Sequence, residues 1–252
     1  MFWKANIWIP ADDQKSKEKN LKILIMIPAY NEAENIERVV KNIVENYPQY
    51  DYVVINDGST DDTRKVCARS KFNLLDLPVN TGLSGAIKSG MRYANYYGYD
   101  YVVQLDGDGQ HDPVYIQKMF EVMEQSNADI VIGSRFKTKK KPVTMRMIGS
   151  QIITTAIYLT TKGKYIGDVT SGMRLFNKRM IKQFGYDMHY SPEPDTLAYL
   201  LNCGVKIEEV QVEMYERIAG SSYLNWKGSI WYMMKMLFSI FLFQWFRQRI
   251  KG

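Results

Sequence analysis

The first half of the chain alternates between short apolar runs and longer segments whose apolar residues recur at helical spacing. Residues 21–27 are apolar at nearly every position, which is typical of a strand covered on both faces. Asn31, with Glu34 three residues later, predicts a helix start of the capping-box type. The expected strands are residues 21–27, 52–55, 73–77 and 100–105, and the expected helices are residues 34–46, 63–70 and 83–97. This alternation predicts an α/β fold with a mostly parallel sheet and helices on both faces.

Polar clusters follow three of these strands, at residues 28–32, 56–61 and 106–110. In a parallel sheet the carboxyl ends of the strands meet at one edge, and ligands bind there. We therefore expect the three clusters to form one site.

The second half is less regular. Residues 116–125 read as a helix, while residues 128–132 and 205–212 read as strands. Residues 148–161 are apolar and rich in threonine, and residues 168–177 are polar and then strand-like. A basic run without an acid contains Arg135, Lys137, Lys139, Lys140, Lys141 and Arg146. Such a run is either a solvated loop or part of a site for an anion.

The two ends of the chain are candidates for contact with a membrane. Residues 1–10 carry aromatic and apolar side chains but no signal-peptide pattern, so they are either an interfacial anchor or a disordered start. Residues 230–246 are the most hydrophobic segment, shorter than the roughly 20 residues that a spanning helix needs. We favour a helix lying in the membrane interface, with an oligomer contact as the alternative. The expected division is residues 1–20, 21–224 and 225–252.

Composition narrows the class of partner. The 252 residues carry a formal net charge of +6, which favours an anionic partner such as a nucleic acid, a membrane surface or a phosphorylated substrate. No nucleic-acid recognition motif is present, and acidic strand-end clusters would repel a phosphate backbone, so we reject a nucleic-acid-binding protein. Two cysteines, Cys67 and Cys203, match no disulfide framework or metal spacing and suit a reducing compartment.

The segment after the fourth expected strand carries the clearest chemistry. Asp106 and Asp108 are separated by one glycine, so a turn at the strand end can aim both carboxylates at one point. Gln110 adds a neutral oxygen, and oxygen ligands are those that Mg²⁺ and Mn²⁺ prefer. We therefore expect a divalent cation site here, with the Asp108 carboxylate facing solvent.

Six motifs in order resemble family 2 glycosyltransferases, in particular the branch that makes polyprenyl-phosphate sugars. They are PAYNE at residues 28–32, NDGSTDDT at 56–63, DGDGQHDP at 106–113, GSRF at 133–136, SGMR at 171–174 and RIAGSS at 217–222. The similarity covers residues 21–224, and it implies a GT-A fold, glycosyltransferase activity and a nucleotide-sugar donor. UDP-sugars are favoured over GDP-sugars only by the habit of the family.

The resemblance also implies roles for individual residues of the donor site. Asp57 would hydrogen-bond the base, although an ordinary turn with Gly58 would place an aspartate there too. Asp106 would face the ribose and the cation, while Asp108 and Gln110 would hold the cation. The implied nucleotide-binding residues are Pro28, Ala29, Tyr30, Glu32, Asp57, Lys88 and Asp106.

The acceptor is either a phosphate or a hydroxyl group. A phosphate acceptor needs cationic and hydrogen-bonding partners, which the resemblance assigns to Arg135, Ser171, Arg174, Arg217 and Ser222. The chain departs from the related RxxGxSK pattern because Tyr223 replaces the lysine. A hydroxyl acceptor needs a general base, for which Glu193 and Asp195 are the candidates.

The sequence thus predicts a metal-dependent inverting glycosyltransferase, with polyprenyl phosphate as acceptor, at the cytoplasmic face of the cell membrane. The chain would be peripheral or monotopic there, and its C-terminal helix could support a homo-oligomer. The alternative is transfer to a saccharide hydroxyl of a cell-wall or lipid-linked glycan, with Asp195 or Glu193 as the base.

Overall fold

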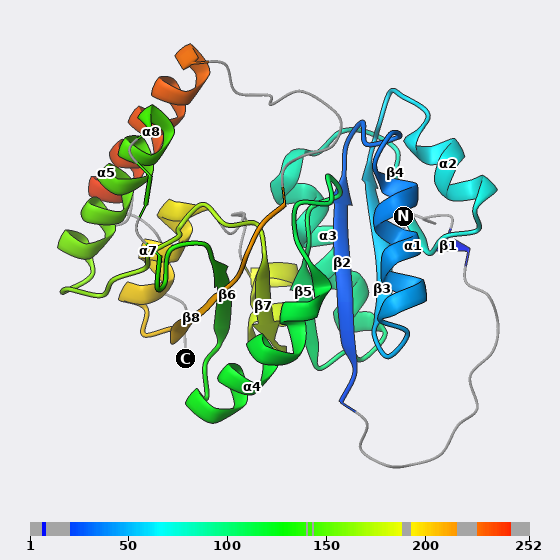
Figure 1. Ribbon diagram of the computed structural model, residues 1–252, viewed down its shortest axis with the longest axis horizontal. Helices are drawn as coiled ribbons and strands as arrows, with labels where there is room; N and C mark the ends of the chain where they lie inside the picture. The colour runs from blue at the N-terminus through cyan, green and yellow to red at the C-terminus, as the bar shows by residue number, and fades with distance from the viewer. Residues whose placement is uncertain are drawn as a thin grey trace. The chain divides into compact units, whose positions relative to one another are not determined.

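The computed structural model describes residues 7–8, 21–139, 141–142, 144–187, 193–215 and 226–242, and the chain falls into two compact units (Figure 1). The first unit comprises Met1–Ile116, Leu175–Ser191 and Met214–Gly220. The second unit comprises Gln117–Arg174, Pro192–Glu213 and Ser221–Gly252.

The first unit is organised around a mostly parallel sheet. Its strands are β1 (Ile7–Trp8), β2 (Ile23–Ala29), β3 (Asp51–Asp57), β4 (Leu74–Leu77), β5 (Tyr101–Gln104) and β7 (Arg174–Asn177), which enters this unit at Leu175. Their order is β1-β4-β3-β2-β5-β7. The four strands predicted in this region are confirmed and run parallel to one another, whereas β1 pairs antiparallel with β4. The apolar runs are buried, as expected for strands covered on both faces.

Helices pack around this sheet. They are α1 (Ile36–Asn46), α2 (Thr63–Arg69), α3 (Gly82–Tyr96), a 3₁₀ turn (Pro113–Tyr115), α6 (Lys178–Lys182) and a π turn (Gln183–Asp187). Helix α1 buries Ile36, Val39, Val40 and Ile43, the i, i+3, i+4, i+7 stripe of an amphipathic helix. Strands β2, β3 and β5 end at Ala29, Asp57 and Gln104, so the three polar clusters follow carboxyl ends of parallel strands as predicted.

The start of α1 differs from the prediction. The helix begins at Ile36 with Asn35 at the N-cap, and the Glu32 carbonyl accepts hydrogen bonds from the N–H groups of both residues (2.9 and 3.0 Å). Asn31 lies upstream in the left-handed region, with φ of +58°. The capping-box prediction was wrong because the Asn31 side chain bonds a neighbouring loop instead.

The second unit contains a pair of parallel strands and four helices among the described residues. They are α4 (Ile116–Ser126), β6 (Ile130–Ser134), α5 (Met145–Thr160), α7 (Pro194–Asn202), β8 (Ile207–Gln211) and α8 (Trp226–Phe241). Strands β6 and β8 are in register from Ile130 opposite Ile207 to Ser134 opposite Gln211. Helices α5 and α7 were not predicted from the sequence. A threonine cap begins α5, since the Thr144 hydroxyl accepts the Met147 N–H (3.3 Å).

The C-terminal apolar segment begins as helix α8, which packs against α5 and α7. Met236 and Ile240 of α8 are 2% and 1% exposed, and Gly149 of α5 lies directly under Met233. The described part of this segment therefore contributes to the core of the second unit. Within the described ranges, no helix combines the length and the apolar character needed to cross a bilayer.

Candidate active site

The loops after β2 and β3 are joined through Asn31. Its side-chain oxygen accepts the Thr60 N–H (2.9 Å), and its own N–H donates to the Ser59 hydroxyl (3.0 Å). The next residue, Glu32, donates its N–H to the Thr63 hydroxyl (2.9 Å). The positive φ of Asn31 lets it face the β3 loop, and asparagine tolerates that conformation better than most residues. These bonds bring together two of the polar clusters that the sequence predicted to share a site.

Asp57 ends β3 and is 3% exposed. One carboxylate oxygen accepts both the N–H (2.8 Å) and the hydroxyl (2.6 Å) of Thr81, the residue before α3. Gly58 follows with φ of +63°, and a Cβ there would lie 2.4 Å from the Asn80 nitrogen. The aspartate therefore makes a long-range bond to the start of α3, which an ordinary local turn does not explain. Its contact with a base stays a prediction.

The carboxylates after β5 differ in exposure. The Asp106 side chain is 38% exposed, whereas Asp108 is 4% exposed and accepts the Gln110 N–H at one oxygen (3.0 Å). The expectation that Asp108 faces solvent was therefore wrong, because the turn folds its carboxylate back onto the backbone. The Gln110 amide donates to the Tyr215 carbonyl (3.2 Å), which leaves the amide oxygen as an acceptor.

Two glycines set the shape of this turn. A Cβ at Gly107 would lie 3.2 Å from the Pro28 carbonyl oxygen and 3.6 Å from Cβ of Ala29, so the turn lies directly against the loop after β2. Gly109 has φ of +76°, and a Cβ there would lie 2.6 Å from the Arg38 guanidinium, which donates to the Asp108 carbonyl (3.4 Å). The third polar cluster thus joins the first, as predicted.

The donor set of this turn suits a hard divalent cation. Asp106, Asp108 and Gln110 offer two carboxylates and an amide oxygen within one turn. Within the described ranges, no group of three or more His, Cys, Asp or Glu residues is placed to hold a metal ion. The predicted site therefore depends on the amide oxygen of Gln110 and on ligands from outside the protein, such as the phosphates of a donor.

Asp112 anchors the segment after the turn, a role that the sequence analysis missed. Its carboxylate accepts hydrogen bonds from the hydroxyls of Tyr47 and Tyr215 (3.0 Å each) and from the Val114 N–H (2.9 Å). Burial, reinforced by the bond to Asp112, raises the pKa of Tyr47 to about 12. The Asp-Pro pair at residues 112–113 was a signal for the local cap, but not for the tyrosines.

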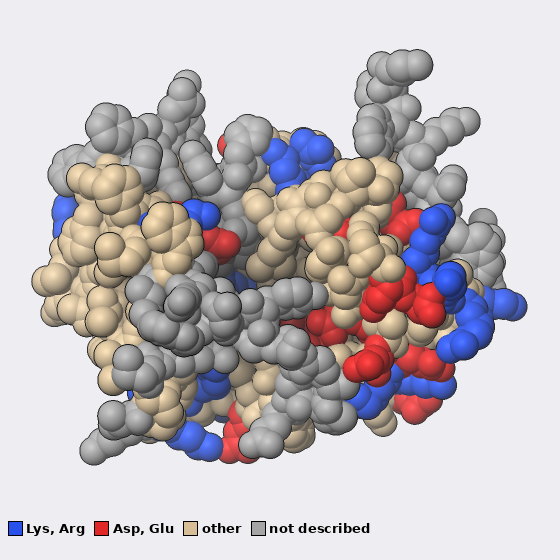
Figure 2. Space-filling model, turned by 90° about the horizontal axis from the view of Figure 1, so that it is seen from above, with Lys and Arg blue, Asp and Glu red and all other residues tan. Residues whose placement is uncertain are grey.

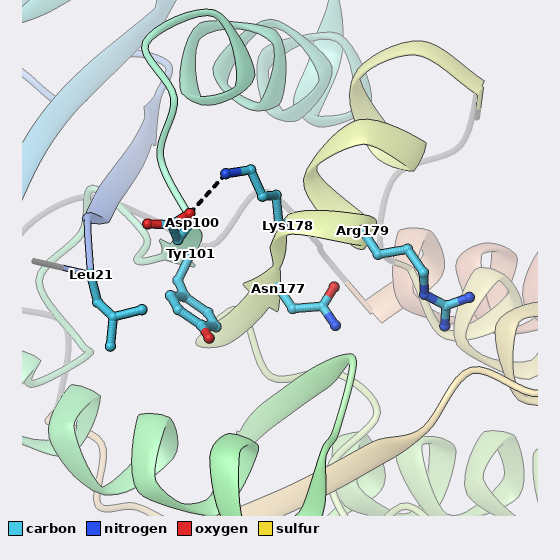
Figure 3. Close-up of a pocket in the computed structure, with 6 residues that line it drawn as sticks. All are labelled: Leu21, Asp100, Tyr101, Asn177, Lys178 and Arg179. Atoms are coloured by element: carbon cyan, nitrogen blue, oxygen red, sulfur yellow. Dashed lines mark hydrogen bonds and ion pairs between the residues drawn. The ribbon is translucent and has the colours of Figure 1, made fainter. Parts of the chain in front are cut away.

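The remaining predicted donor residues also lie in the first unit. Tyr30 follows β2 and is half-buried. Lys88 lies on α3, where burial and then the charge of Arg92 lower its pKa. A separate cavity of about 330 Å³ in this unit lies where β2 and β5 begin, and no predicted site residue lines it. Figure 3 shows the Lys178 amine there joined to Asp100, while Arg179 points away.

Arg135, one of the residues predicted for an acceptor phosphate, is fixed by an acidic partner. In the second unit, its Nε and Nη2 donate to the two oxygens of Asp168 (2.7 and 2.8 Å), and Nη2 also donates to the Thr170 hydroxyl (3.1 Å). The Asp168 side chain is fully buried, whereas that of Arg135 is 25% exposed. Burial alone would raise the pKa of the Asp168 carboxyl, but Arg135 outweighs it and holds that pKa below its ordinary value. Asp168 was missed because its partner lies 33 residues away in the sequence.

Ser171 and Arg174 are buried within the second unit. The Ser171 hydroxyl donates to the Gly133 carbonyl (2.6 Å) and accepts the Met173 N–H (3.2 Å). The Arg174 guanidinium donates to the carbonyls of Ser171 (2.9 Å) and Val169 (3.0 Å) and is 3% exposed as a residue. These bonds give both residues a structural role, and their contact with an acceptor stays a prediction. Arg217 and Ser222 lie outside the described residues.

Three lysines of the basic run after β6 form ion pairs or hydrogen bonds within the second unit. Lys139 pairs with Glu213 (2.6 Å) at the surface, and the Lys137 amine donates to the Glu209 carbonyl. Lys141 is half-buried near the hydroxyls of Ser150 (3.4 Å) and Thr154 (3.3 Å), and burial lowers its pKa. Lys140 and the side chain of Arg146 lie outside the described residues.

The two candidate bases lie at the start of α7. Asp195 is 6% exposed, and its carboxylate accepts the hydroxyl of Ser239 from α8 (2.6 Å). Glu193 occupies the N-cap, and its carbonyl accepts the Leu197 N–H (3.0 Å). Ser239 was visible in the sequence only as an interruption of the apolar tail.

Comparison with known proteins identifies the family of the chain. Residues 24–185 match the profile of glycosyl transferase family 2. The chain is 31% identical over 186 residues to the UDP-N-acetylglucosamine–dolichyl-phosphate N-acetylglucosaminyltransferase of Methanococcus voltae, covering 64% of this chain and 71% of that protein. It is 27% identical over 219 residues to the undecaprenyl-phosphate mannosyltransferase of Micrococcus luteus, covering 81% of this chain and 88% of that protein.

A solved structure supports the fold. Glucosyl-3-phosphoglycerate synthase from Mycobacterium tuberculosis, crystallised with Mn²⁺, UDP and phosphoglyceric acid, superposes with a TM-score of 0.63 at 16% identity. The similarity covers 88% of this chain and 78% of that one. Together with the family profile, these findings confirm the resemblance predicted from the motifs: the chain is a glycosyltransferase and belongs to glycosyl transferase family 2.

Proposed function

We propose that the chain transfers a sugar from a nucleotide-sugar, with UDP-sugars as the first candidates, to the phosphate group of a polyprenyl phosphate. The observation that carries this proposal is the state of Arg135. Asp168 fixes its guanidinium through two bonds, while the Nη1 amino group bonds no residue that the structure describes. A fixed guanidinium with a remaining donor is suited to a phosphate oxygen. The names of the two relatives above point to the same acceptor class.

The donor would bind in the first unit, against the three loops that meet there. Pro28, Ala29, Tyr30 and Glu32 would line the nucleotide, and Asp57 would reach the base. Asp106, Asp108 and Gln110 would hold Mg²⁺ or Mn²⁺, which would offset the charge developing on the departing diphosphate. The Mn²⁺ and UDP bound in the structure of glucosyl-3-phosphoglycerate synthase support this choice of ligands.

The transfer itself is a single displacement. An oxygen of the acceptor phosphate forms a bond to the anomeric carbon while the bond from that carbon to the diphosphate oxygen breaks. The nucleoside diphosphate leaves with the bonding electrons, and the configuration at the anomeric carbon inverts. A phosphate oxygen is already ionised at neutral pH, so the step requires no general base.

The buried state of Asp195 disfavours the alternative hydroxyl acceptor. A general base must come within hydrogen-bond distance of the proton that it removes. Asp195 is 6% exposed and already accepts a bond from Ser239, so reaching an acceptor would require that contact to rearrange. Glu193, at the N-cap of α7, remains the base to test if a hydroxyl acceptor is found.

A lipid acceptor places the enzyme at a membrane. We propose the cytoplasmic face of the cell membrane, where a peripheral or monotopic protein would meet both a nucleotide-sugar and a polyprenyl phosphate. The basic character of the chain supports attraction to that surface.

The test compares two acceptors that differ only in the phosphate. Purified protein is incubated with UDP- and GDP-sugars, Mn²⁺ or Mg²⁺, and either a short polyprenyl phosphate or the matching polyprenol. We expect one donor to give a lipid-linked sugar, detected by mass spectrometry, with the phosphate only. Transfer to polyprenol or a glycan hydroxyl, without transfer to the phosphate, would overturn the proposal.

A further inference from the structure

Helix α5 turns an apolar face outward. Its exposed positions follow helical spacing, and they are Ile148, Gln151, Ile152, Thr155, Tyr158 and Leu159. Ile152 is 45% exposed, Tyr158 46% and Leu159 67%. The outward face of a helix in a water-soluble domain normally carries charged residues, but none of the exposed side chains described on α5 is charged.

Helix α8 also exposes large apolar side chains, although Lys235 lies among them. Among the side chains of α8 that the structure describes, the exposed ones are Trp231, Met234, Lys235, Phe238 and Phe241, with Leu242 following the helix. Trp231 is 75% exposed, Met234 60% and Phe238 56%. Large apolar side chains at such exposure mark a contact surface when they are contiguous.

The two helices pack against each other within the second unit. Gly149 of α5 allows Met233 of α8 to approach so closely that a Cβ would lie 2.0 Å from its sulfur. On the inner side, Met236 and Ile240 are buried, and Ser239 bonds Asp195 of α7. Figure 1 shows α5 and α8 side by side, and the same edge of the molecule is mostly uncharged in Figure 2.

The charges near the exposed face of α5 and α8 favour an anionic partner. Neither helix contains an acidic residue, and none occurs anywhere from residue 130 to residue 167 or from residue 217 to residue 252. Basic residues flank α5 in sequence, with Lys162 and Lys164 just beyond its end. Exposed aromatic side chains with a polar end, such as Tyr158, Tyr165 and Trp231, suit the level of lipid head groups.

We propose that α5 and α8 together form a docking face for a lipid bilayer with anionic head groups. The inference deepens the proposed function, since it rests on the acceptor being a lipid, and it extends the membrane contact from the C-terminal segment to α5. Apolar side chains of both helices enter the interface, while lysines around them contact the head groups. The enzyme lies on the membrane through two helices that belong to its core.

The test uses point substitutions, because deleting α8 would uncover Met236 and Ile240 and so damage the unit. The full chain carrying Ile152→Asp or Leu159→Asp is floated with vesicles of phosphatidylcholine, alone or mixed in equal parts with phosphatidylglycerol. Val44→Asp on α1 is the matched control, since Val44 is 48% exposed in the other unit. Thermal unfolding checks that each variant is folded, and Ile152→Ser serves as a milder substitution.

We expect the wild type and the Val44→Asp variant to bind the anionic vesicles, and more weakly as salt is raised. Each α5 variant should lose about tenfold or more in partition coefficient, because an apolar side chain no longer enters the interface. Folded α5 variants that bind as the wild type does would overturn the proposal. So would a wild type that ignores the vesicles, or sedimentation showing that the substitutions split a dimer.

Turnover separates this inference from the proposed function. The α5 variants should keep wild-type transfer to a short, detergent-dispersed polyprenyl phosphate, since the acceptor is then presented without a bilayer. Vesicle binding by a protein that transfers nothing to polyprenyl phosphate would sink the proposed acceptor and leave the docking face standing. Normal transfer to polyprenyl phosphate without vesicle binding would support the proposed acceptor and overturn the docking face.

Discussion

Different kinds of donor stabilise the aspartates Asp57 and Asp112 of the first unit and Asp168 of the second unit. In the first unit, Asp57 is bonded by Thr81 and Asp112 by two tyrosines, all of them neutral donors. In the second unit, the buried Asp168 is bonded by the guanidinium of Arg135. A carboxylate held by neutral groups keeps its charge for a ligand, whereas one paired with arginine has its counter-charge within the protein.

This difference matches the two ligands of the proposed reaction. A nucleotide-sugar brings a diphosphate that needs a cation, and acidic loops attract such a cation. An acceptor phosphate needs a positive group, and Asp168 holds the guanidinium of Arg135 in one position. Asp168 thus acts as a positioning residue in this proposal. The predictions below test each side of the comparison.

The largest effect is expected in the first unit. Asp108→Asn should remove turnover by about a hundredfold or more, because the cation would lose a charged ligand. The fold should survive, since asparagine keeps an oxygen that can accept the Gln110 N–H. Turnover and thermal unfolding are measured together, with Asp62→Asn, at an exposed ion pair with Lys65, as the matched control. Undiminished wild-type activity in excess chelator would remove the metal from the proposal.

In the second unit, Asp168→Asn should lower the free energy of unfolding by on the order of 3 kcal/mol, because a largely buried arginine loses its counter-charge. Glu213→Gln, which breaks the exposed pair with Lys139, should change the free energy of unfolding little. Chemical denaturation measures both.

The loss of unfolding free energy caused by Asp168→Asn should depend on pH in a defined direction. Because the folded pKa of Asp168 lies below its ordinary value, its stabilisation is complete above the ordinary carboxyl pKa. It disappears as the pH falls through the lowered value. The wild type and Asp168→Asn should therefore converge in acid, and a constant gap would show that the pair is not responsible.

Arg135→Ala tests the acceptor side directly. Loss of a charge-assisted contact should cost roughly ten- to a hundredfold in kcat/KM for polyprenyl phosphate. Lys139→Ala, in the same basic run, should do less, and hydrolysis of the donor should be unchanged in both. Arg174→Ala is interpreted only if it stays folded, since that guanidinium bonds two buried carbonyls.

The same assay ranks the candidate bases. With a phosphate acceptor, Asp195→Asn and Glu193→Gln should damage transfer less than Arg135→Ala does, because no proton is removed. A dead Asp195→Asn beside a normal Arg135→Ala would reverse the choice of acceptor. In that case a general base worth about 10²–10⁴-fold would be the better explanation.

The smallest effect concerns the neutral donors of the first unit. Tyr47→Phe and Tyr215→Phe should each lower the free energy of unfolding by about 1 kcal/mol, since each removes one hydrogen bond to Asp112. Tyr96→Phe, at a side chain that is 79% exposed, is the control. If neither variant differs from the control, the tyrosines do not hold the segment after the turn at residues 106–110.

The sequence predicted the first unit better than the second. Strands β2 to β5 and helices α1 to α3 were all predicted because each carries a strong local period, apolar throughout or at helical spacing. Helices α5 and α7 were missed because α5 is apolar on its outward face and α7 is buried nearly all round. Neither therefore shows the contrast between faces on which such predictions depend.

By itself, the sequence determined the family, the order of strands and helices in the first unit and the three polar loops at its strand ends. Those features depend on local periodicity and on short motifs. The tertiary structure alone decided that Asp108 is buried, that Asn31 joins two loops, and that Asp168 fixes Arg135. It also decided that α8 belongs to a core while keeping an apolar face outside. Each of these depends on which distant segments meet, because burial and pairing of a side chain are properties of the packed chain and not of its neighbours in sequence.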